Sequence, residues 1–242
     1  MKVSIFITCI CDSFYPRVGE ALVRVLKKQG VQLDFPPDQT CCGQPAINSG
    51  YWDDARTVAT TMLHAFKDSQ YVVTPSGSCL AAMQKFYPVL FGRDAQHYEM
   101  ANDLLKKTHE FSQFLVKVLE VKNVGAYFPY RVTYHSSCHA RRFLGIDEDV
   151  RTLLNNVRDL TFIPLPHEDL CCGFGGTFSV KMPEISEAMV DEKVAAIAGT
   201  GAEVLVGTDL GCLMNIGGRL KKQGLKVRVM HIAQLLDEGM NA

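Results

Sequence analysis

The tripeptide Cys41-Cys42-Gly43 recurs as Cys171-Cys172-Gly173 in a chain of 242 residues. Each copy has one further cysteine upstream and one downstream, so eight of the nine cysteines form two matching sets of four, namely Cys9, Cys41, Cys42 and Cys79, and Cys138, Cys171, Cys172 and Cys212. The offset is 129 residues between the first members and 133 between the last. The sequence therefore predicts a duplicated unit with a small drift from loop insertions.

Four thiolates from separated segments are the donor set of an all-cysteine zinc site or an iron–sulfur cluster. Adjacent side chains in an extended segment point to opposite faces, so two neighbouring sulfurs share a centre only where the chain turns sharply. Gly43 and Gly173 permit such a turn at positive φ. A single pair would suggest ordinary buried cysteines or a vicinal disulfide, whereas the repeat favours metal. Cys11 aligns with Ala140 and belongs to neither set.

Short apolar runs alternate with helical patterns in both halves of the chain. The predicted strands are Val3–Thr8, Val31–Phe35, Tyr71–Thr74, Val132–His135, Leu160–Pro164 and Val204–Thr208. Predicted helices include Phe14–Gln29, Asp53–Asp68 and Pro183–Ala198. This alternation predicts an α/β fold of two tandem, pseudo-repeated parallel-sheet units, with the cysteine loops at the carboxyl ends of the strands. We expect a first domain over residues 1–125 and a second over 126–242.

Composition excludes several classes of partner. The net charge is −1, from 25 basic and 26 acidic residues, and the absence of a Lys/Arg run argues against nucleic acid. No stretch approaches the roughly 20 apolar residues of a membrane helix, and the apolar start reads as a strand rather than an export signal. A chain that is not exported keeps its thiols reduced, so we expect a cytoplasmic protein with metal or redox chemistry.

The cysteine pattern resembles the cysteine-rich CCG domain of heterodisulfide reductase B subunits and related iron–sulfur oxidoreductase subunits. The segments 41–50, 171–181, 212–220 and 229–233 more specifically resemble the lactate utilization protein A family. This resemblance implies a subunit that acts with two partner proteins, one of them ferredoxin-type, in oxidising L-lactate to pyruvate for growth on lactate. It implies one or two [4Fe–4S] clusters on the two cysteine sets, and a fold likeness alone does not establish that function.

The heterodisulfide reductase pattern ends each unit in Cys-x-x-Cys, and this sequence has Ser76 and Asp209 where the first of those cysteines would stand. Ser76 and Asp209 are either oxygen ligands or loop residues, and we favour loop residues because oxygen ligands to such clusters are uncommon. Four thiolates per unit suffice for one [4Fe–4S] cluster or one Zn²⁺. Three functional classes stay open: an electron-transfer subunit, a zinc-stabilised scaffold, and an enzyme that binds substrate at an open iron.

The two halves need not hold the same centre. Basic side chains surround the first cysteine of the second set: His135, His139, Arg141 and Arg142. We therefore expect the second half to carry the redox-active cluster and the first half a cluster or structural zinc. His109 and His231 are expected to open a late helix of each half, in a packing or capping role. The run Gly173-Phe174-Gly175-Gly176 lacks the spacing of a dinucleotide loop, so NAD or flavin binding is not supported.

Overall fold

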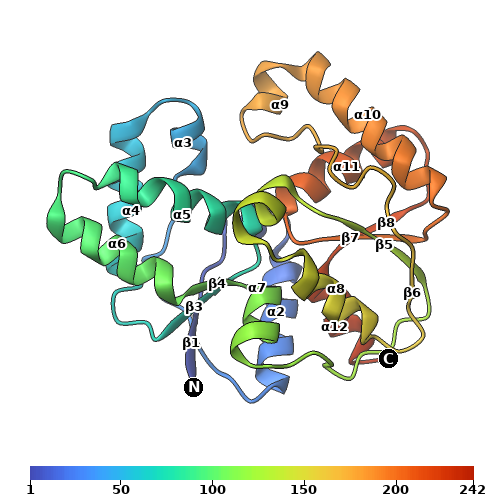
Figure 1. Cartoon of the computed structure of the whole chain (residues 1–242), viewed down its shortest axis with the longest axis horizontal. Coiled ribbons are helices and arrows are strands. Elements are labelled where there is room, and N and C mark those ends of the chain that lie inside the picture. Colours follow the sequence, from blue (N-terminus) through green and yellow to red (C-terminus); the bar gives the residue numbers. More distant parts are fainter.

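The computed structural model describes residues 1–242 and contains two four-stranded sheets, both entirely parallel (Figure 1). In the first half the strand order is β2-β1-β3-β4, with bounds β1 (Lys2–Ile5), β2 (Gln32–Asp34), β3 (Tyr71–Thr74) and β4 (Thr108–Glu110). Its helical segments are α1 (Cys9–Phe14), α2 (Pro16–Lys28), α3 (Gln44–Asn48), α4 (Trp52–Ala65), α5 (Gly77–Leu90), α6 (Ala95–Lys107), α7 (Phe111–Gln113) and the π-helical turn η1 (Phe114–Val118).

The second half repeats this order as β6-β5-β7-β8. Its strands are β5 (Arg131–His135), β6 (Thr161–Phe162), β7 (Val204–Gly207) and β8 (Arg228–His231). Its helical segments are the π-helical turn η2 (Ala140–Leu144), α8 (Asp147–Asn155), α9 (Phe178–Lys181), α10 (Pro183–Gly199), α11 (Leu210–Lys222) and α12 (Ile232–Gly239). The predicted α/β fold with two pseudo-repeated parallel sheets is thus confirmed.

Helices of each half pack against helices of the other half. The last helix, α12, packs on α2 of the first half, and α7 with η1 packs on α8 of the second. Likewise α5 packs beside η2, and α11 beside α1. The largest buried cluster of apolar side chains therefore draws on both halves, from Val3 and Leu22 to Val132 and Leu236. The boundary between residues 125 and 126 stays a prediction, because this shared core crosses it.

Each sheet has a fourth strand that the sequence patterns did not predict. β4 and β8 are short, and each is followed at once by a helix. His109 consequently lies inside β4, and Glu110 is the residue whose side chain caps α7. His231 ends β8 and caps α12 as expected. Placing His109 at a helix start is wrong by one residue, because the capping position equivalent to His231 is occupied by Glu110.

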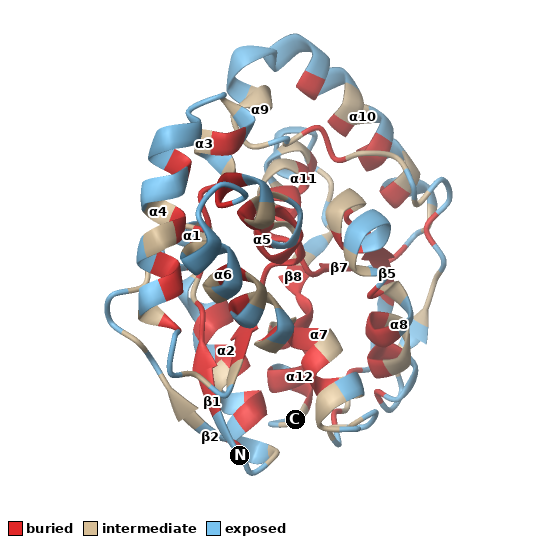
Figure 2. Ribbon diagram, turned by 60° about the vertical axis from the view of Figure 1, so that its left-hand side comes forward, coloured by how far each residue is buried: buried red, intermediate tan, exposed pale blue.

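The burial pattern follows from this packing. Buried residues concentrate on β1, β3, β5 and β7 and on α5, α7 and α12, while the outward faces of α4, α6 and α10 are exposed (Figure 2). None of the helices combines the length with the apolar character that crossing a membrane requires.

Candidate metal centres

All eight repeated cysteines lie at the carboxyl edges of the two sheets, where parallel α/β sheets place their ligands. Cys9 begins α1 directly after β1, and Cys79 lies in the first turn of α5 after β3. In the second half, Cys138 follows β5 and Cys212 lies in the first turn of α11. The Cys-Cys-Gly segments precede α3 and α9. Several of the expected cysteine loops are therefore strand-to-helix junctions.

The four thiols of the first half contact one another in a chain. Cys9 Sγ lies 3.9 Å from Cys41 Sγ, and the Cys42 thiol forms hydrogen bonds with Cys41 and Cys79. The Gly43 N–H also donates to Cys41 Sγ at 3.4 Å. Hydrogen bonds from Cys42 and Cys9 lower the pKa of Cys41 to about 3, so Cys41 is a thiolate at neutral pH.

The second half repeats the arrangement. The Cys172 thiol lies 3.0 Å from Cys212 Sγ, and hydrogen bonds from Cys138 and Cys172 lower the pKa of Cys171 to about 2. The Gly173 N–H donates to Cys171 Sγ at 3.5 Å, as Gly43 does in the first half. In both halves the first cysteine of the adjacent pair is the one whose pKa is lowered. None of the nine cysteines forms a disulfide, so the vicinal-disulfide alternative does not hold in this structure.

A left-handed glycine shapes each Cys-Cys-Gly turn. Gly43 has φ +84° and Gly173 has φ +78°, values that side chains with a Cβ rarely adopt. Each turn is also tied to the helix after the third strand: Tyr87 of α5 donates to the Cys42 carbonyl at 3.2 Å, and Asn215 of α11 donates to the Cys172 carbonyl at 2.8 Å. These contacts fix the backbone of each turn against the helix that follows the third strand.

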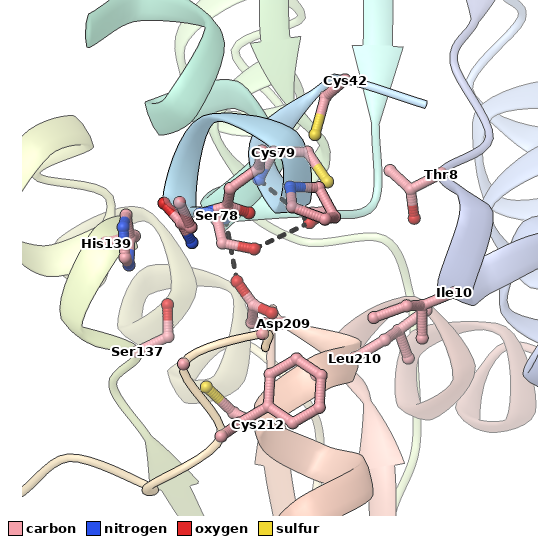
Figure 3. A pocket seen from close by; sticks show the side chains of 18 of the residues that line it. Thr8, Ile10, Cys42, Ser78, Cys79, Ser137, His139, Asp209, Leu210 and Cys212 are labelled. Carbon is pink, nitrogen blue, oxygen red and sulfur yellow. Dashed lines mark hydrogen bonds between the residues drawn. The ribbon is translucent and has the colours of Figure 1, made fainter. Parts of the chain in front are cut away.

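Both quartets line a single cavity of about 340 Å³ between the halves (Figure 3). Its wall includes all eight repeated cysteines and polar residues from both halves, among them Thr8, Gln44, Asn48, Ser137, His139 and Thr177. Sequence reasoning missed Gln44, Asn48 and Thr177. The only available signal was their position just after each Cys-Cys-Gly, at the same sheet edge. The sequence also did not indicate that the two quartets face one common space.

Asp209 links the halves beside this cavity. Its Oδ2 accepts the Ser78 N–H at 2.8 Å, and in Figure 3 it lies between Ser78 and Cys212. Ser76 caps α5 by accepting the Cys79 N–H at 3.3 Å. Burial raises the pKa of Asp209. The side-chain oxygens of Ser76 and Asp209 are engaged in hydrogen bonds that position the start of α5, which favours the loop-residue interpretation over oxygen ligands.

The expected cationic surroundings of the second quartet are only partly present. Burial lowers the pKa of His135 to about 3, so its ring is neutral, and the expectation of a cation there is wrong. Arg141 is paired with Glu168 at 3.5 Å, and Arg142 is exposed. His139 does contact the quartet, with Nδ1 3.4 Å from Cys138 Sγ. Cys11 is fully buried, donates to the Tyr15 carbonyl at 3.7 Å and does not line the cavity.

The donor sets fit a thiophilic metal. A tetrahedral ion with metal–sulfur bonds of about 2.3 Å holds its sulfurs about 3.8 Å apart, close to the 3.9 Å between Cys9 and Cys41. A four-iron core holds its thiolates farther apart, so it requires the sulfurs to move outward. The cavity beside both quartets provides space for that movement. The chemistry of the donors thus supports metal or cluster binding.

Comparisons with known proteins agree with this site. A cysteine-rich domain family, CCG, matches residues 3–84 and again 132–217. Lactate utilization protein A of Geobacillus thermodenitrificans is 55% identical over 98% of this chain and 99% of its own length. The protein of the same name from an Exiguobacterium species is 52% identical over 99% and 98% of the two chains.

Among solved structures, a hypothetical protein from Helicobacter pylori has a TM-score of 0.59 at 14% identity. The likeness covers all of this chain and 49% of that protein, and it supports the fold alone. The sequence relatives and the two matches to the cysteine-rich domain decide the family. The chain belongs to the lactate utilization protein A family, and each of its halves carries a CCG cysteine-rich domain.

Proposed function

We propose that this chain is an iron–sulfur electron-transfer subunit of a multi-protein system that oxidises L-lactate to pyruvate and supports growth on lactate. The observation that carries the proposal is the pair of thiol quartets facing one cavity. The relatives' name, lactate utilization protein A, supports the metabolic role. The proposed partners are two other lactate utilization proteins, one of them a ferredoxin-type iron–sulfur protein. Nine free thiols suit the cytoplasm as the compartment.

The proposed ligands are the two quartets: Cys9, Cys41, Cys42 and Cys79 in the first half, and Cys138, Cys171, Cys172 and Cys212 in the second. When bound, an iron–sulfur cluster supplies a one-electron carrier whose potential depends on charge, burial and hydrogen bonds to sulfur. The N–H groups of Gly43 and Gly173 donate to thiolate sulfurs, which stabilises negative charge there. We propose the redox-active cluster in the second half, and a further cluster or Zn²⁺ in the first.

The rim of the cavity offers a docking region for a partner. Val180 lines the cavity and is 81% exposed, and Met182 and Ile185 beside it are exposed as well. Exposed apolar side chains grouped at the mouth of a site are typical of interaction surfaces. A partner docked here would lie next to the cavity that both quartets line.

The electronic test uses anaerobically isolated full-length protein. We expect a brown protein that dithionite bleaches, with an EPR signal in the reduced state. Cys172→Ser should remove that signal, whereas Cys11→Ala should leave it intact, because Cys11 is buried outside the cavity and its counterpart is Ala140. Loss of the iron signal only in Cys42→Ser would assign the redox-active cluster to the first half instead.

The metabolic test reconstitutes the chain with its two proposed partners and measures lactate-dependent reduction of an artificial acceptor. The proposal predicts turnover by the assembly and none by the isolated chain. Turnover by the isolated chain would favour an enzyme that binds substrate in the cavity. The zinc-stabilised scaffold is the other candidate, favoured by the sulfur spacing of a single ion, and it predicts a colourless protein that contains zinc and is inert to dithionite.

A further inference from the structure

His135 is the one histidine of the chain that is fully buried without a hydrogen-bond partner. It ends β5, is 1% exposed, and neither ring nitrogen forms a hydrogen bond. The other fully buried histidine, His231, uses both nitrogens, Nδ1 with the Ala233 N–H and Nε2 with the Pro75 carbonyl. Buried polar side chains in folded proteins nearly always have a hydrogen-bond partner or another ligand, so we expect His135 to have one.

The candidate partner lies on the side of the second quartet. One nitrogen of His135 and the sulfurs of Cys172 and Cys212 all lie within 4.8 Å of one another, and all three residues are buried. Neutral imidazole and thiolate are both ligands of zinc and of iron. A single ion between these three atoms would satisfy the orphaned imidazole and two members of the quartet at once.

The first half has no equivalent donor. Val3 and Val132 occupy the same register, since Val3 pairs with Tyr71 in β3 and Val132 pairs with Val204 in β7. The position of His135 therefore corresponds to Phe6, whose ring packs edge-on against Phe66 at 5.9 Å. At equivalent positions, the first half therefore has the phenyl ring of Phe6 and the second half has the imidazole of His135, which can bind a metal.

We propose that His135 is a nitrogen ligand of the centre in the second half, completing a mixed imidazole–thiolate donor set with Cys172 and Cys212. The first centre is then an all-sulfur site, and the two centres of the chain are chemically different. This inference rests on the proposed function only in requiring that the second quartet holds a metal. A single zinc or iron ion would be shared by His135, Cys172 and Cys212. In a four-iron cluster each iron takes one protein ligand, so His135 would replace one cysteine of the quartet on one iron.

The test is X-ray absorption at the edge of whichever metal the anaerobically isolated full chain contains. The unaltered protein should show a nitrogen shell at about 2.0–2.1 Å beside sulfur at about 2.3 Å. His135→Phe, which copies the first half, should remove the nitrogen shell and lower metal affinity in the second half by on the order of tenfold or more. His135→Cys should restore metal content with an all-sulfur shell.

His139→Gln is the matched control, because His139 contacts Cys138 yet is predicted not to be a ligand. A nitrogen shell that persists in His135→Phe, or that disappears in His139→Gln instead, would overturn the inference. Sulfur ligands alone around the metal of the unaltered protein would also overturn the inference. This measurement does not depend on whether a variant folds, and its result would leave the proposed function intact. An unaltered protein that binds no metal would overturn both this inference and the proposed function.

Discussion

At the scale of single residues, the two Cys-Cys-Gly turns differ in how tightly they are packed. A Cβ at Gly173 would lie 2.7 Å from the Ser186 carbonyl oxygen, whereas one at Gly43 would meet nothing closer than 3.6 Å. Both positions have left-handed φ, which costs a residue with a Cβ about 1–2 kcal/mol. The second turn adds a clash with backbone, which cannot move as a flexible side chain does.

We therefore predict that Gly173→Ala destabilises the chain by more than Gly43→Ala. Gly30→Ala is the control for the conformational cost alone, since Gly30 has φ +74° and open space around it. Gly30→Ala and Gly43→Ala should each lower the free energy of unfolding by about 1–2 kcal/mol, and Gly173→Ala by clearly more. Urea unfolding measures all three, and equal losses would show that Ser186 yields to the added methyl group.

Glu110 supplies a prediction about pH. Burial raises the pKa of this carboxyl from its usual 4.5 to about 8. Between these values the folded protein holds a proton that the unfolded chain has lost, so the contribution of Glu110 to stability is greatest below pH 4.5 and falls as pH rises toward 8. Each pH unit in this window costs at most about 1.4 kcal/mol.

Glu110→Gln removes that titration while keeping an oxygen for the N–H groups of Ser112 and Gln113. We expect the stability difference between the unaltered protein and Glu110→Gln to shift by a few kcal/mol in favour of the variant from pH 5 to pH 8. Urea unfolding at both pH values measures this shift. Parallel stability curves would show that Glu110 titrates in the folded protein as it does in water.

At the scale of secondary-structure elements, α12 is fixed by a cap that also joins the halves. His231 Nδ1 accepts the Ala233 N–H at 3.1 Å, so Nε2 carries the proton and donates to the Pro75 carbonyl of the first half at 3.0 Å. A shorter side chain can keep the cap but cannot reach Pro75. The two contributions are therefore separable by substitution.

His231→Asn should cost about 1–3 kcal/mol, because a buried carbonyl loses its donor. His231→Ala should cost about 1 kcal/mol more, because the cap is lost as well. Thermal unfolding of the two variants gives the difference. If both variants unfold at the same temperature, the cap contributes nothing beyond the contact with Pro75.

The elements also show how far the sequence predicts this fold. β3 is predicted residue for residue, and β5 and β7 to within one residue, because their runs of branched residues are buried by helices. The strand predicted over Val3–Thr8 runs three residues past the end of β1 at Ile5. The helix predicted over Phe14–Gln29 is found as α2, which begins at Pro16 and ends at Lys28, and the short helix α1 before it was not predicted. β4 and β8 escaped prediction because three or four residues that lead straight into a helix show no separate periodicity.

For the candidate site, spacing alone predicted the grouping of the eight cysteines, because each follows a strand of a repeated unit. The structure brings the members of each quartet together as expected. Spacing could not predict the shared cavity or the orphaned ring of His135. Both depend on how the halves pack and on which side chains face inward, and that is set by contacts far apart in the sequence.

At the scale of the whole molecule, the reciprocal packing of α12 on α2 and of α7 on α8 ties the halves together. We predict that residues 1–125 or 126–242 expressed alone remain unfolded or aggregate, because each would expose part of the shared core. Co-expressed halves should assemble into a folded complex, which circular dichroism and size-exclusion chromatography detect. Two halves that each unfold cooperatively on their own would contradict this and support independent domains.

The account as a whole depends on each quartet sharing one inorganic centre. The most direct measurement is the iron, zinc and acid-labile sulfide content per chain of anaerobically isolated protein, compared with Cys42→Ser and Cys172→Ser. We predict metal in the unaltered protein, the loss of one centre in each variant, and retention of the other centre in both. Metal content that is unchanged by either substitution, or absent from the unaltered chain, would contradict the account.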